Sequence, residues 1–238
     1  LQPRMANFTD FDALEAEPDV RLRYCEAPDG TIPDAYILPG TKSTVADLRR
    51  LKQAGWAGPL GKALERGASV VGICGGLQML GLHIADPDGV EAPSGGEEGL
   101  GILPIRTRFA AAKQTSQVRG VHLDSGAEVE GYEIHQGRSE AAAGPVTPAL
   151  RLSERGGRPC RDFDGARAFE GRAWGTYVHG LFDRAEFRRA FVNGLRAARG
   201  WAPLSGGAPY DPHYELDRLA DHVGAHVDMD RILDLAGI

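Results

Sequence analysis

The sequence predicts an α/β fold in which helices flank a mixed, mostly parallel central sheet, with extra strands and a C-terminal helix added to it. The apolar run "ASVVGI" at 68–73 is typical of a parallel strand that is buried on both faces. Strand-like and helix-like segments alternate through the first third of the chain, as in a layered β-α-β unit. The 238 residues, of which 42% are hydrophobic, suffice for a large globular core.

Each element of the first third has its own local signal. The stretch "AYILPG" is an apolar strand that ends in a Pro-Gly turn. The helix that follows has Thr44 as its expected N-cap and Gly55 after its last turn. In order, the expected elements are strands over 20–25 and 35–40, helices over 44–55 and 59–67, and the strand over 68–73.

The extra elements follow in the middle and at the end of the chain. A loop rich in Gly, Pro and acidic residues covers 86–99. Short strand-like pieces come next, separated by polar stretches expected as loops at 110–117, 138–148 and 153–165. A strand and a turn within 173–183 then lead into a helix over 185–200. We therefore expect one domain over 1–200, with 201–238 as a linker and C-terminal helical extension of the same domain.

Composition excludes several classes of function. A net charge of −6 leaves no basic surplus for binding nucleic-acid phosphates. The three cysteines form no CxxC pair, so we expect neither a disulfide framework nor a metal site. Because no signal peptide or membrane-spanning run occurs, a cytoplasmic location without membrane contact is expected. The start at Leu1 and the lack of a GxxxxGK[ST] phosphate loop suggest a piece of a longer protein.

The stretch "SVVGICGGLQML" at 69–80 points to a nucleophile. Its cysteine, Cys74, stands between a buried strand and a helix, among glycines of the kind that a sharp bend requires. The first N–H groups of the helix favour a thiolate, and the N–H of Gly75 is placed to receive an oxyanion. The pattern predicts a nucleophile elbow that carries sulfur in place of oxygen.

A cysteine nucleophile needs a base, and His179 is the best placed of the seven histidines. It follows the apolar strand "WGTYV" and precedes Gly180. Because the carboxyl ends of parallel strands share one sheet edge, where α/β active sites lie, we expect His179 beside Cys74.

Several motifs resemble those of class I (triad-type) glutamine amidotransferase domains. "GICGGLQML" is similar to their G-x-C-x-G-x-Q motif, and "LPG" at 38–40 to the loop that donates a second oxyanion N–H. The branch found at the C-terminus of cobyric acid synthases is the most similar, through "NFTDFDAL", "LPGTKSTVADLRRL", "GYEIHQGRS" and "YVHGLFD". The resemblance covers nearly the whole chain and implies a flavodoxin-like glutaminase domain.

The resemblance also implies roles for individual residues. It assigns Cys74 as nucleophile and His179 as acid/base, Gly40 and Gly75 as oxyanion donors, and Gln78 as a contact to the substrate glutamine. Ammonia would pass to an N-terminal ATP-dependent synthetase region of the same polypeptide, which would use ATP and Mg. That region would amidate the corrinoid adenosylcobyrinic acid a,c-diamide in cobalamin biosynthesis. No cofactor is expected in the present chain.

One departure from the family concerns the third member of the triad. Ordinary members have H-P-E, whereas the H-G-L at 179–181 has no carboxylate two residues after the histidine, as is typical of the cobyric acid synthase branch. Asp183 and Glu133 are the candidates for this role, each with a structural role as the alternative. His135 in "YEIHQG" either lines the glutamine pocket or is a hydrogen-bonded strand residue.

Four other interpretations remain open. The sister activity, cobyrinic acid a,c-diamide synthase, shares this chemistry, although "PGTKST" favours the cobyric acid branch. A lipid II isoglutaminyl amidotransferase subunit is a further relative. A cysteine hydrolase of related fold is disfavoured by Gln78 and the loop at 39–40. A non-catalytic assembly module is disfavoured by the presence of both Cys74 and His179.

Overall fold

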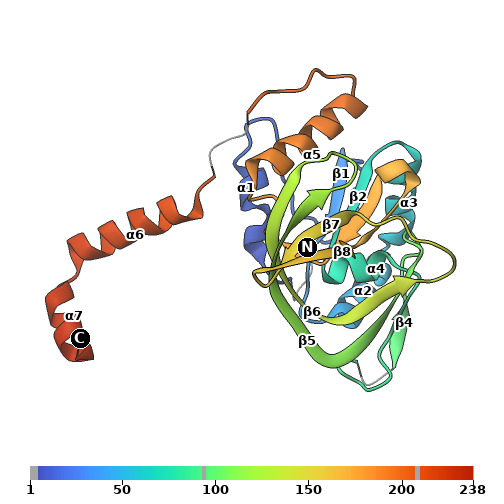
Figure 1. The fold of residues 1–238 in the computed structure, drawn as a ribbon. Helices are drawn as coiled ribbons and strands as arrows, with labels where there is room; N and C mark the ends of the chain where they lie inside the picture. Colours follow the sequence, from blue (N-terminus) through green and yellow to red (C-terminus); the bar gives the residue numbers. More distant parts are fainter. Residues whose placement is uncertain (1–4, 93–94, 207–209, 238) are drawn as a thin grey trace. The chain divides into compact units, whose positions relative to one another are not determined.

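The computed structural model describes residues 5–92, 95–206 and 210–237, in two compact units, 1–208 and 209–238 (Figure 1). Residues 93–94 of the expected loop and 207–209 of the expected linker lie outside the described residues. The first unit is built on a four-stranded sheet with the order β1-β2-β10-β9. Its strands are β1 (Ala35–Leu38), β2 (Ser69–Ile73), β10 (Ala173–Thr176) and β9 (Ala166–Ala168). The first three are parallel and β9 is antiparallel, which confirms the mixed, mostly parallel sheet.

A second, seven-stranded sheet supplies the extra strands. It contains β3 (His83–Ala85), β4 (Gly96–Glu98), β5 (Ile105–His122), β6 (Glu128–Ala141), β7 (Leu150–Arg155), β8 (Arg158–Asp164) and β11 (Val178–His179). The expected loops at 110–117 and 153–165 are wrong, because these residues belong to β5 and to the β7–β8 hairpin. Those at 86–99 and 138–148 are wrong in part, because they include β4 and the end of β6. Their polar side chains alternate with buried ones or lie on an exposed part of the strand, so polarity alone did not distinguish them from loops.

The expected helices are confirmed, with small shifts of their ends. They are α2 (Thr44–Gln53), α3 (Ala57–Glu65), α4 (Gly75–Leu80) and α5 (Ala185–Ala198), joined by the short η1 (Phe8–Phe11), α1 (Asp12–Glu15) and η2 (Phe169–Gly171). The expected N-cap is wrong by one residue, since Ser43 occupies the N-cap position of α2, without a capping hydrogen bond from its side chain, and Thr44 is the first helical residue. Helix α5 packs on the sheet through Phe187, whose ring centroid lies 6.2 Å from that of Trp174 on β10.

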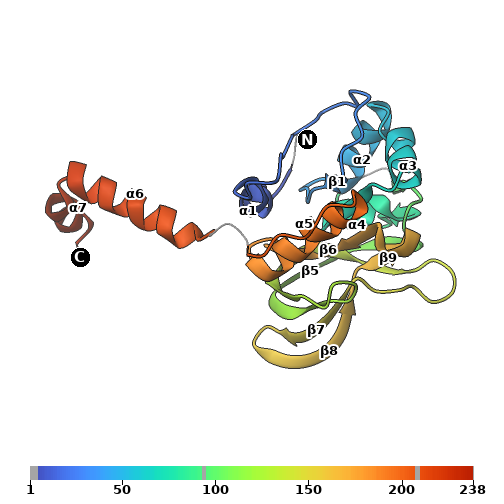
Figure 2. The same ribbon diagram turned by 90° about the horizontal axis from the view of Figure 1, so that it is seen from above.

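The strand expected over 20–25 is wrong, because these residues form no strand. Their alternating pattern is that of an edge strand, but an apolar groove separates 21–26 from β1. Figure 2 shows this N-terminal segment arching around the side of β1. As a result, 35–37 of β1 are partly exposed, whereas 70–73 of β2 are buried.

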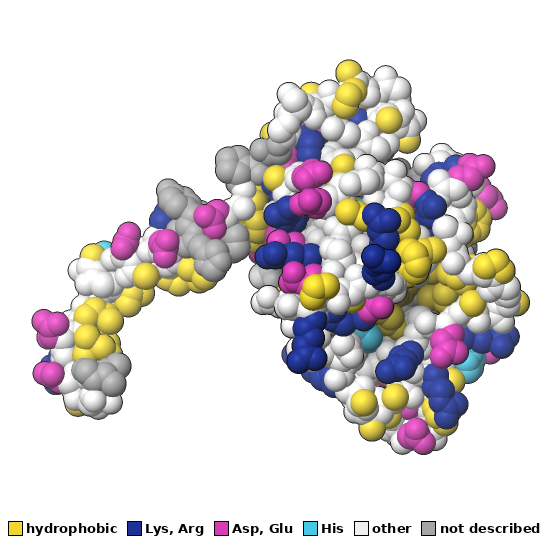
Figure 3. All heavy atoms as spheres, viewed as in Figure 1, with side chains coloured by type: hydrophobic (Ala, Val, Ile, Leu, Met, Phe, Trp, Pro, Cys, Tyr) yellow, Lys and Arg dark blue, Asp and Glu magenta, His cyan; other side chains and the backbone are white. Residues whose placement is uncertain are grey.

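The second unit consists of helices α6 (Pro212–His226) and α7 (Met229–Ala236). Hydrophobic side chains line both helices in Figure 3, and Leu216, Leu219 and Ile232 are among the exposed ones. That this extension belongs to the same domain as 1–200 stays a prediction. Among the residues that the structure describes, no helix combines the length and apolar character needed to cross a bilayer.

Candidate active site

Cys74 occupies a strained bend between β2 and α4. Its φ of 50° and ψ of −106° lie outside the regions that most side chains adopt. A Cβ atom on Gly76 would lie 2.0 Å from the carbonyl oxygen of Leu38, and one on Gly72 would lie 2.6 Å from the backbone of Gly76. The glycines are therefore required by close backbone approach, as the sequence predicts for a nucleophile elbow.

The loop after β1 brings Gly40 against both catalytic candidates. A Cβ atom on Gly40 would lie 2.7 Å from Cε1 of His179 and 3.6 Å from Cβ of Cys74. One on Gly75 would lie 2.8 Å from Cγ2 of Thr41, on the same loop. The structure thus brings Gly40, Cys74 and His179 together and places Gly75 at the start of α4 beside them. The use of the two glycines' N–H groups as oxyanion donors stays a prediction.

The partner of His179 is a carboxylate that the sequence did not single out. Nδ1 of His179 lies 2.7 Å from Oδ2 of Asp10, and both residues are almost completely buried. The other carboxylate oxygen, Oδ1, accepts a hydrogen bond of 2.9 Å from the backbone N–H of Gly180. With both oxygens engaged, Asp10 fixes the orientation of the ring through Nδ1.

Asp10 and Cys74 also set the charge of the histidine. Burial lowers the pKa of His179, but the hydrogen bonds and charges of Asp10 and Cys74 outweigh it and raise this pKa to about 9. The ring of Tyr132, on β6, stacks on the imidazole at a centroid distance of 5.4 Å. The amide Nδ2 of Asn7 lies 3.2 Å from Nε2. The imidazolium form is therefore favoured at neutral pH in a closed, oriented site.

The two carboxylates that the sequence suggested have other partners. Glu133 forms a two-point ion pair with Arg155, with N···O distances of 3.1 and 3.2 Å. The side chain of Asp183 is exposed, and its backbone N–H donates to the carbonyl of Gly180. In their place, Asp10 accepts the hydrogen bond from Nδ1 of His179.

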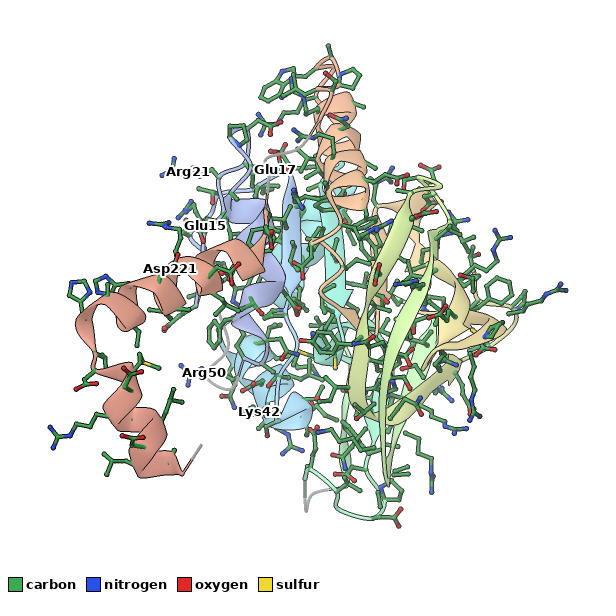
Figure 4. The ribbon with its side chains drawn as sticks, turned by 60° about the vertical axis from the view of Figure 1, so that its left-hand side comes forward. Glu15, Glu17, Arg21, Lys42, Arg50 and Asp221 are labelled. Atoms are coloured by element: carbon green, nitrogen blue, oxygen red, sulfur yellow. The ribbon has the colours of Figure 1, made fainter. Side chains whose placement is uncertain are left out.

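Asp10 is not predictable from the sequence, because its contact with His179 spans 169 residues. It lies within the motif "NFTDFDAL", but no local pattern indicates where this segment packs. A buried ion pair fixes it, since Nε of Arg188 on α5 lies 2.6 Å from Oε1 of Glu17, which Figure 4 labels. Arg189 adds a second anchor through Asp19 at 3.0 Å. Such complementary buried charges could have suggested that α5 holds the N-terminal segment.

Gln78 connects three elements of the site. Its Nε2 donates to the carbonyl of Gln136, at 3.0 Å, and to the hydroxyl of Tyr177, at 3.2 Å. Its Oε1 accepts from Oγ1 of Thr44 at the start of α2, at 3.3 Å. The buried amide therefore ties α4 to α2 and to β6, and its contact with substrate glutamine stays a prediction.

His135 lies in the wall of a neighbouring cavity. Its ring stacks on Tyr177 with 3.8 Å between centroids, and its Nδ1 lies 3.2 Å from the carbonyl oxygen of Gly137. Burial lowers the pKa of His135 to about 4, so the ring is neutral. Leu77 and Arg138 line the same cavity. A role of His135 in the glutamine pocket stays a prediction. Within the described ranges, no group of three or more His, Cys, Asp or Glu residues could hold a metal ion.

Comparison with known proteins identifies the family of this site. The family model of the CobB/CobQ-like glutamine amidotransferase domain matches residues 1–187. The chain belongs to this family. Two solved structures share the fold of this amidotransferase domain, each with a TM-score of 0.55. One is a crystal structure of a glutamine amidotransferase, at 16% identity, covering 82% of this chain and 95% of that one. The other is the structure of PurLQS from Thermotoga maritima, at 18% identity, covering 82% and 96%.

Relatives of higher identity to this amidotransferase domain are cobyric acid synthases. That of Syntrophobacter fumaroxidans is 44% identical over 248 aligned residues, which cover 99% of this chain and 48% of the relative. That of Moorella thermoacetica is 44% identical and covers 99% and 47%, and that of Salmonella typhi is 43% identical and covers 97% and 47%. The chain thus spans about half the length of these relatives.

Proposed function

We propose that this chain is the glutaminase part of a cobyric acid synthase, which releases ammonia from glutamine for use by the rest of that protein. The observation that carries the proposal is the meeting of Cys74 on its strained bend, His179, and the buried carboxylate of Asp10. A nucleophile, an acid/base and an orienting carboxylate form the set that acyl transfer needs. The identity to cobyric acid synthases over almost the whole chain supports the choice of relative.

The reaction uses the site in two stages. The thiolate of Cys74 attacks the side-chain carboxamide of glutamine, and the N–H groups of Gly40 and Gly75 stabilise the oxyanion that forms. The C–N bond breaks as His179 gives its proton to the departing ammonia, which leaves a γ-glutamyl thioester. His179 then removes a proton from water, which attacks the thioester and releases glutamate. Asp10 holds the imidazole in the required orientation throughout.

Ammonia would go to a carboxylate that the remaining part of the full protein activates with ATP and Mg. By similarity, the acceptor is adenosylcobyrinic acid a,c-diamide, in cobalamin biosynthesis. Because the proposed reaction uses ATP and a reduced thiol, we expect it to take place in the cytoplasm. Cobyrinic acid, the substrate of the sister activity, remains the alternative acceptor, because the glutaminase chemistry is the same for both.

Glutamate release from glutamine tests the glutaminase. We expect slow release by the present chain and none by Cys74→Ala, because no other group supplies the nucleophile. Cys160→Ala is the matched control, since Cys160 is a partly exposed residue of β8 outside the site. Equal turnover by Cys74→Ala and the unchanged chain would disprove the assignment.

A second experiment tests whether amidation requires the rest of the full protein. The present chain should form no amidated corrinoid when supplied with glutamine, ATP and Mg, because the described site offers chemistry for releasing ammonia alone. Glutamine-dependent amidation by the isolated chain, measured by mass spectrometry, would overturn this division.

A further inference from the structure

Asn7 places its side-chain amide on the ring of His179, beside the contact that Asp10 makes. Nδ2 of Asn7 lies 3.0 Å from Nδ1 of His179 and 3.2 Å from Nε2. An atom almost equally far from both ring nitrogens lies over the face of the ring, because at the Cε1 edge such short distances would make it overlap Cε1. Gly40 also lies at that edge, since a Cβ atom on it would be 2.7 Å from Cε1. The amide of Asn7 therefore covers a face of the imidazole.

The short helix η1 explains how Asn7 and Asp10 reach the same ring. A 3₁₀ helix has three residues per turn, so side chains three positions apart lie on the same side. Asn7 is the N-cap of η1, and its carbonyl accepts a hydrogen bond of 3.0 Å from the backbone N–H of Asp10. The turn therefore presents both side chains to His179 together.

The backbone of Asn7 does not by itself account for its side chain. It is left-handed, with φ 53° and ψ 59°, a conformation in which Asn is enriched but which Gly adopts more easily. Asn is also a preferred N-cap residue, because its side-chain oxygen can accept from the first N–H groups of a helix. Here the side chain makes no capping hydrogen bond. The contact with His179 is therefore what the amide provides.

This contact distinguishes the two protonation states of the ring. A neutral imidazole has a lone pair on one nitrogen and an electron-rich face, and both attract an amide N–H. An imidazolium is positively charged and carries N–H groups on both nitrogens, so it repels the same amide. Nδ2 of Asn7 therefore favours the neutral ring, whereas Asp10 and Cys74 favour the imidazolium.

One of the titratable groups near the ring loses its charge during the reaction. These groups come from η1, the bend, β6 and the segment after His179, and they are Asp10, Cys74, Tyr132, His135 and Asp183. Burial raises the pKa of Tyr132 and lowers that of His135 to about 4, so both are neutral at pH 7. Burial raises the pKa of Asp183 to about 6, so this carboxylate is ionised at pH 7. Cys74 is the group whose charge the thioester removes.

We propose that Asn7 is a positioning residue for the second stage of the proposed glutaminase reaction, in which its amide favours the neutral His179 that takes a proton from water. The inference rests on the proposed function. In the first stage the thiolate of Cys74 favours the imidazolium, which gives its proton to ammonia. The thioester then carries no charge, so the amide of Asn7 helps to keep the ring neutral. Water gives a proton to Nε2 and its oxygen bonds to the thioester carbon. The C–S bond breaks, and the thiolate that leaves restores the imidazolium for the next cycle.

A histidine titration tests this role in the absence of glutamine. Cys74→Ala removes the thiolate charge, as the thioester does, so NMR of labelled histidine in this variant reports the effects of Asp10 and Asn7. Adding Asn7→Gly should move the titration midpoint of His179 upward by about half a pH unit, because Gly keeps the left-handed backbone and removes the amide. Adding Asn7→Asp should move it upward by about one pH unit or more, because a carboxylate then lies against the ring.

Glu170→Gly is the matched control for the backbone. Glu170 is an exposed residue of η2 with the same left-handed conformation, at φ 57°, so its replacement relieves similar strain away from the site. It should leave the midpoint of His179 unchanged. The Nδ1–H resonance of His179 shows in each variant whether the hydrogen bond to Asp10 persists. An unchanged or lowered midpoint in Asn7→Gly would overturn the proposal. Loss of the Nδ1–H resonance there would overturn it as well, because Asn7 would then serve to anchor the N-terminal segment.

Kinetics connect the contact with the reaction. In Asn7→Gly with Cys74 intact, kcat for glutamate release at pH 6 should fall about threefold, since half a pH unit leaves that much less neutral histidine. KM should change less, and the loss should disappear as the pH rises. An equal loss at every pH would overturn the proposal. A midpoint that moves as expected, in a chain that releases no glutamate, would contradict the proposed function. Glutamate release with an unmoved midpoint would contradict the role of Asn7 alone.

Discussion

His179 has two partners in the site, and different parts of the fold position them. Cys74 comes from a bend formed within 69–80, where close backbone contacts at Gly72 and Gly76 fix the geometry locally. Asp10 comes from a segment 169 residues away, which the ion pairs of α5 hold in place. The position of the nucleophile is therefore set by the sheet, whereas that of the orienting carboxylate depends on how the N-terminal segment docks.

The same contrast appears in the strands that carry the site. β2, which ends just before Cys74, and its parallel neighbour β10 are almost entirely buried. β1, which leads to Gly40, is partly exposed over 35–37. We therefore expect substitutions on the Asp10 side of the site to lower activity by amounts that depend on how far they loosen the N-terminal segment.

The largest effect should come from Asp10→Asn. The amide cannot hold the imidazolium as the carboxylate does, so we expect kcat for glutamate release to fall about 10²- to 10³-fold, with a smaller change in KM. Steady-state kinetics at pH 7 measure this change.

Asp183→Asn is the matched control, because Asp183 is an exposed carboxylate four residues after His179. It should retain activity within about threefold of the unchanged chain. Equal losses in the two variants would show that Asp10 acts through general electrostatics rather than by orienting the ring.

The contrast also explains how far the sequence could predict this site. Cys74 and His179 were predictable because each stands at the end of an apolar strand, a local signal. Asp10 was not, because its role depends on docking by Arg188 and Glu17, which a single sequence does not relate to each other. The strand at 20–25 has the right pattern, but pairing depends on its neighbour in the sheet rather than on the pattern itself.

Gly40→Ala tests the loop after β1, where Gly40 lies against both Cys74 and His179. The new methyl group would fall 2.7 Å from Cε1 of His179, so the ring or the loop must move. We expect a loss in kcat of about 10- to 100-fold, the effect of a misplacement near 1 Å. Gly58→Ala on α3 is the control, since its Cβ atom meets no atom within 4 Å, and it should leave kcat unchanged.

A smaller effect should come from Glu91, which contacts the helix α4 after Cys74 only indirectly, through Thr44 and Gln78. Its Oε2 accepts from the backbone N–H of Thr44 at 2.6 Å and so caps α2, while Thr44 in turn donates to Gln78. Three N–H groups, those of Val90, Glu91 and Ala92, bind the carboxylate of Asp86 and shape this loop.

Glu91→Ala should lower the free energy of unfolding by about 1 kcal/mol, as loss of a helix cap does, and reduce kcat only a few-fold. Urea denaturation gives the stability change. The control is Glu98→Ala, because the side chain of Glu98 is largely exposed, and it should change stability by less than about 0.5 kcal/mol. A tenfold loss of kcat in Glu91→Ala without loss of stability would assign Glu91 a direct role in the chemistry.

The last prediction is a pH dependence of stability, which depends on both partners of His179 together. The pKa of His179 is raised from 6.5 to about 9 in the folded chain, so the folded state holds its proton more tightly than the unfolded state. This contribution is complete below pH 6.5 and is lost as the pH rises through about 9. The difference in free energy of unfolding between the unchanged chain and His179→Gln should therefore shrink over this range.

Both Asp10 and Cys74 raise the pKa of His179. The slope of the free energy of unfolding against pH should therefore decrease in Asp10→Asn and also, separately, in Cys74→Ala. A slope that persists in Asp10→Asn and vanishes in Cys74→Ala would mean that the bend alone sets the charge of the histidine, and that Asp10 orients the ring without holding its proton.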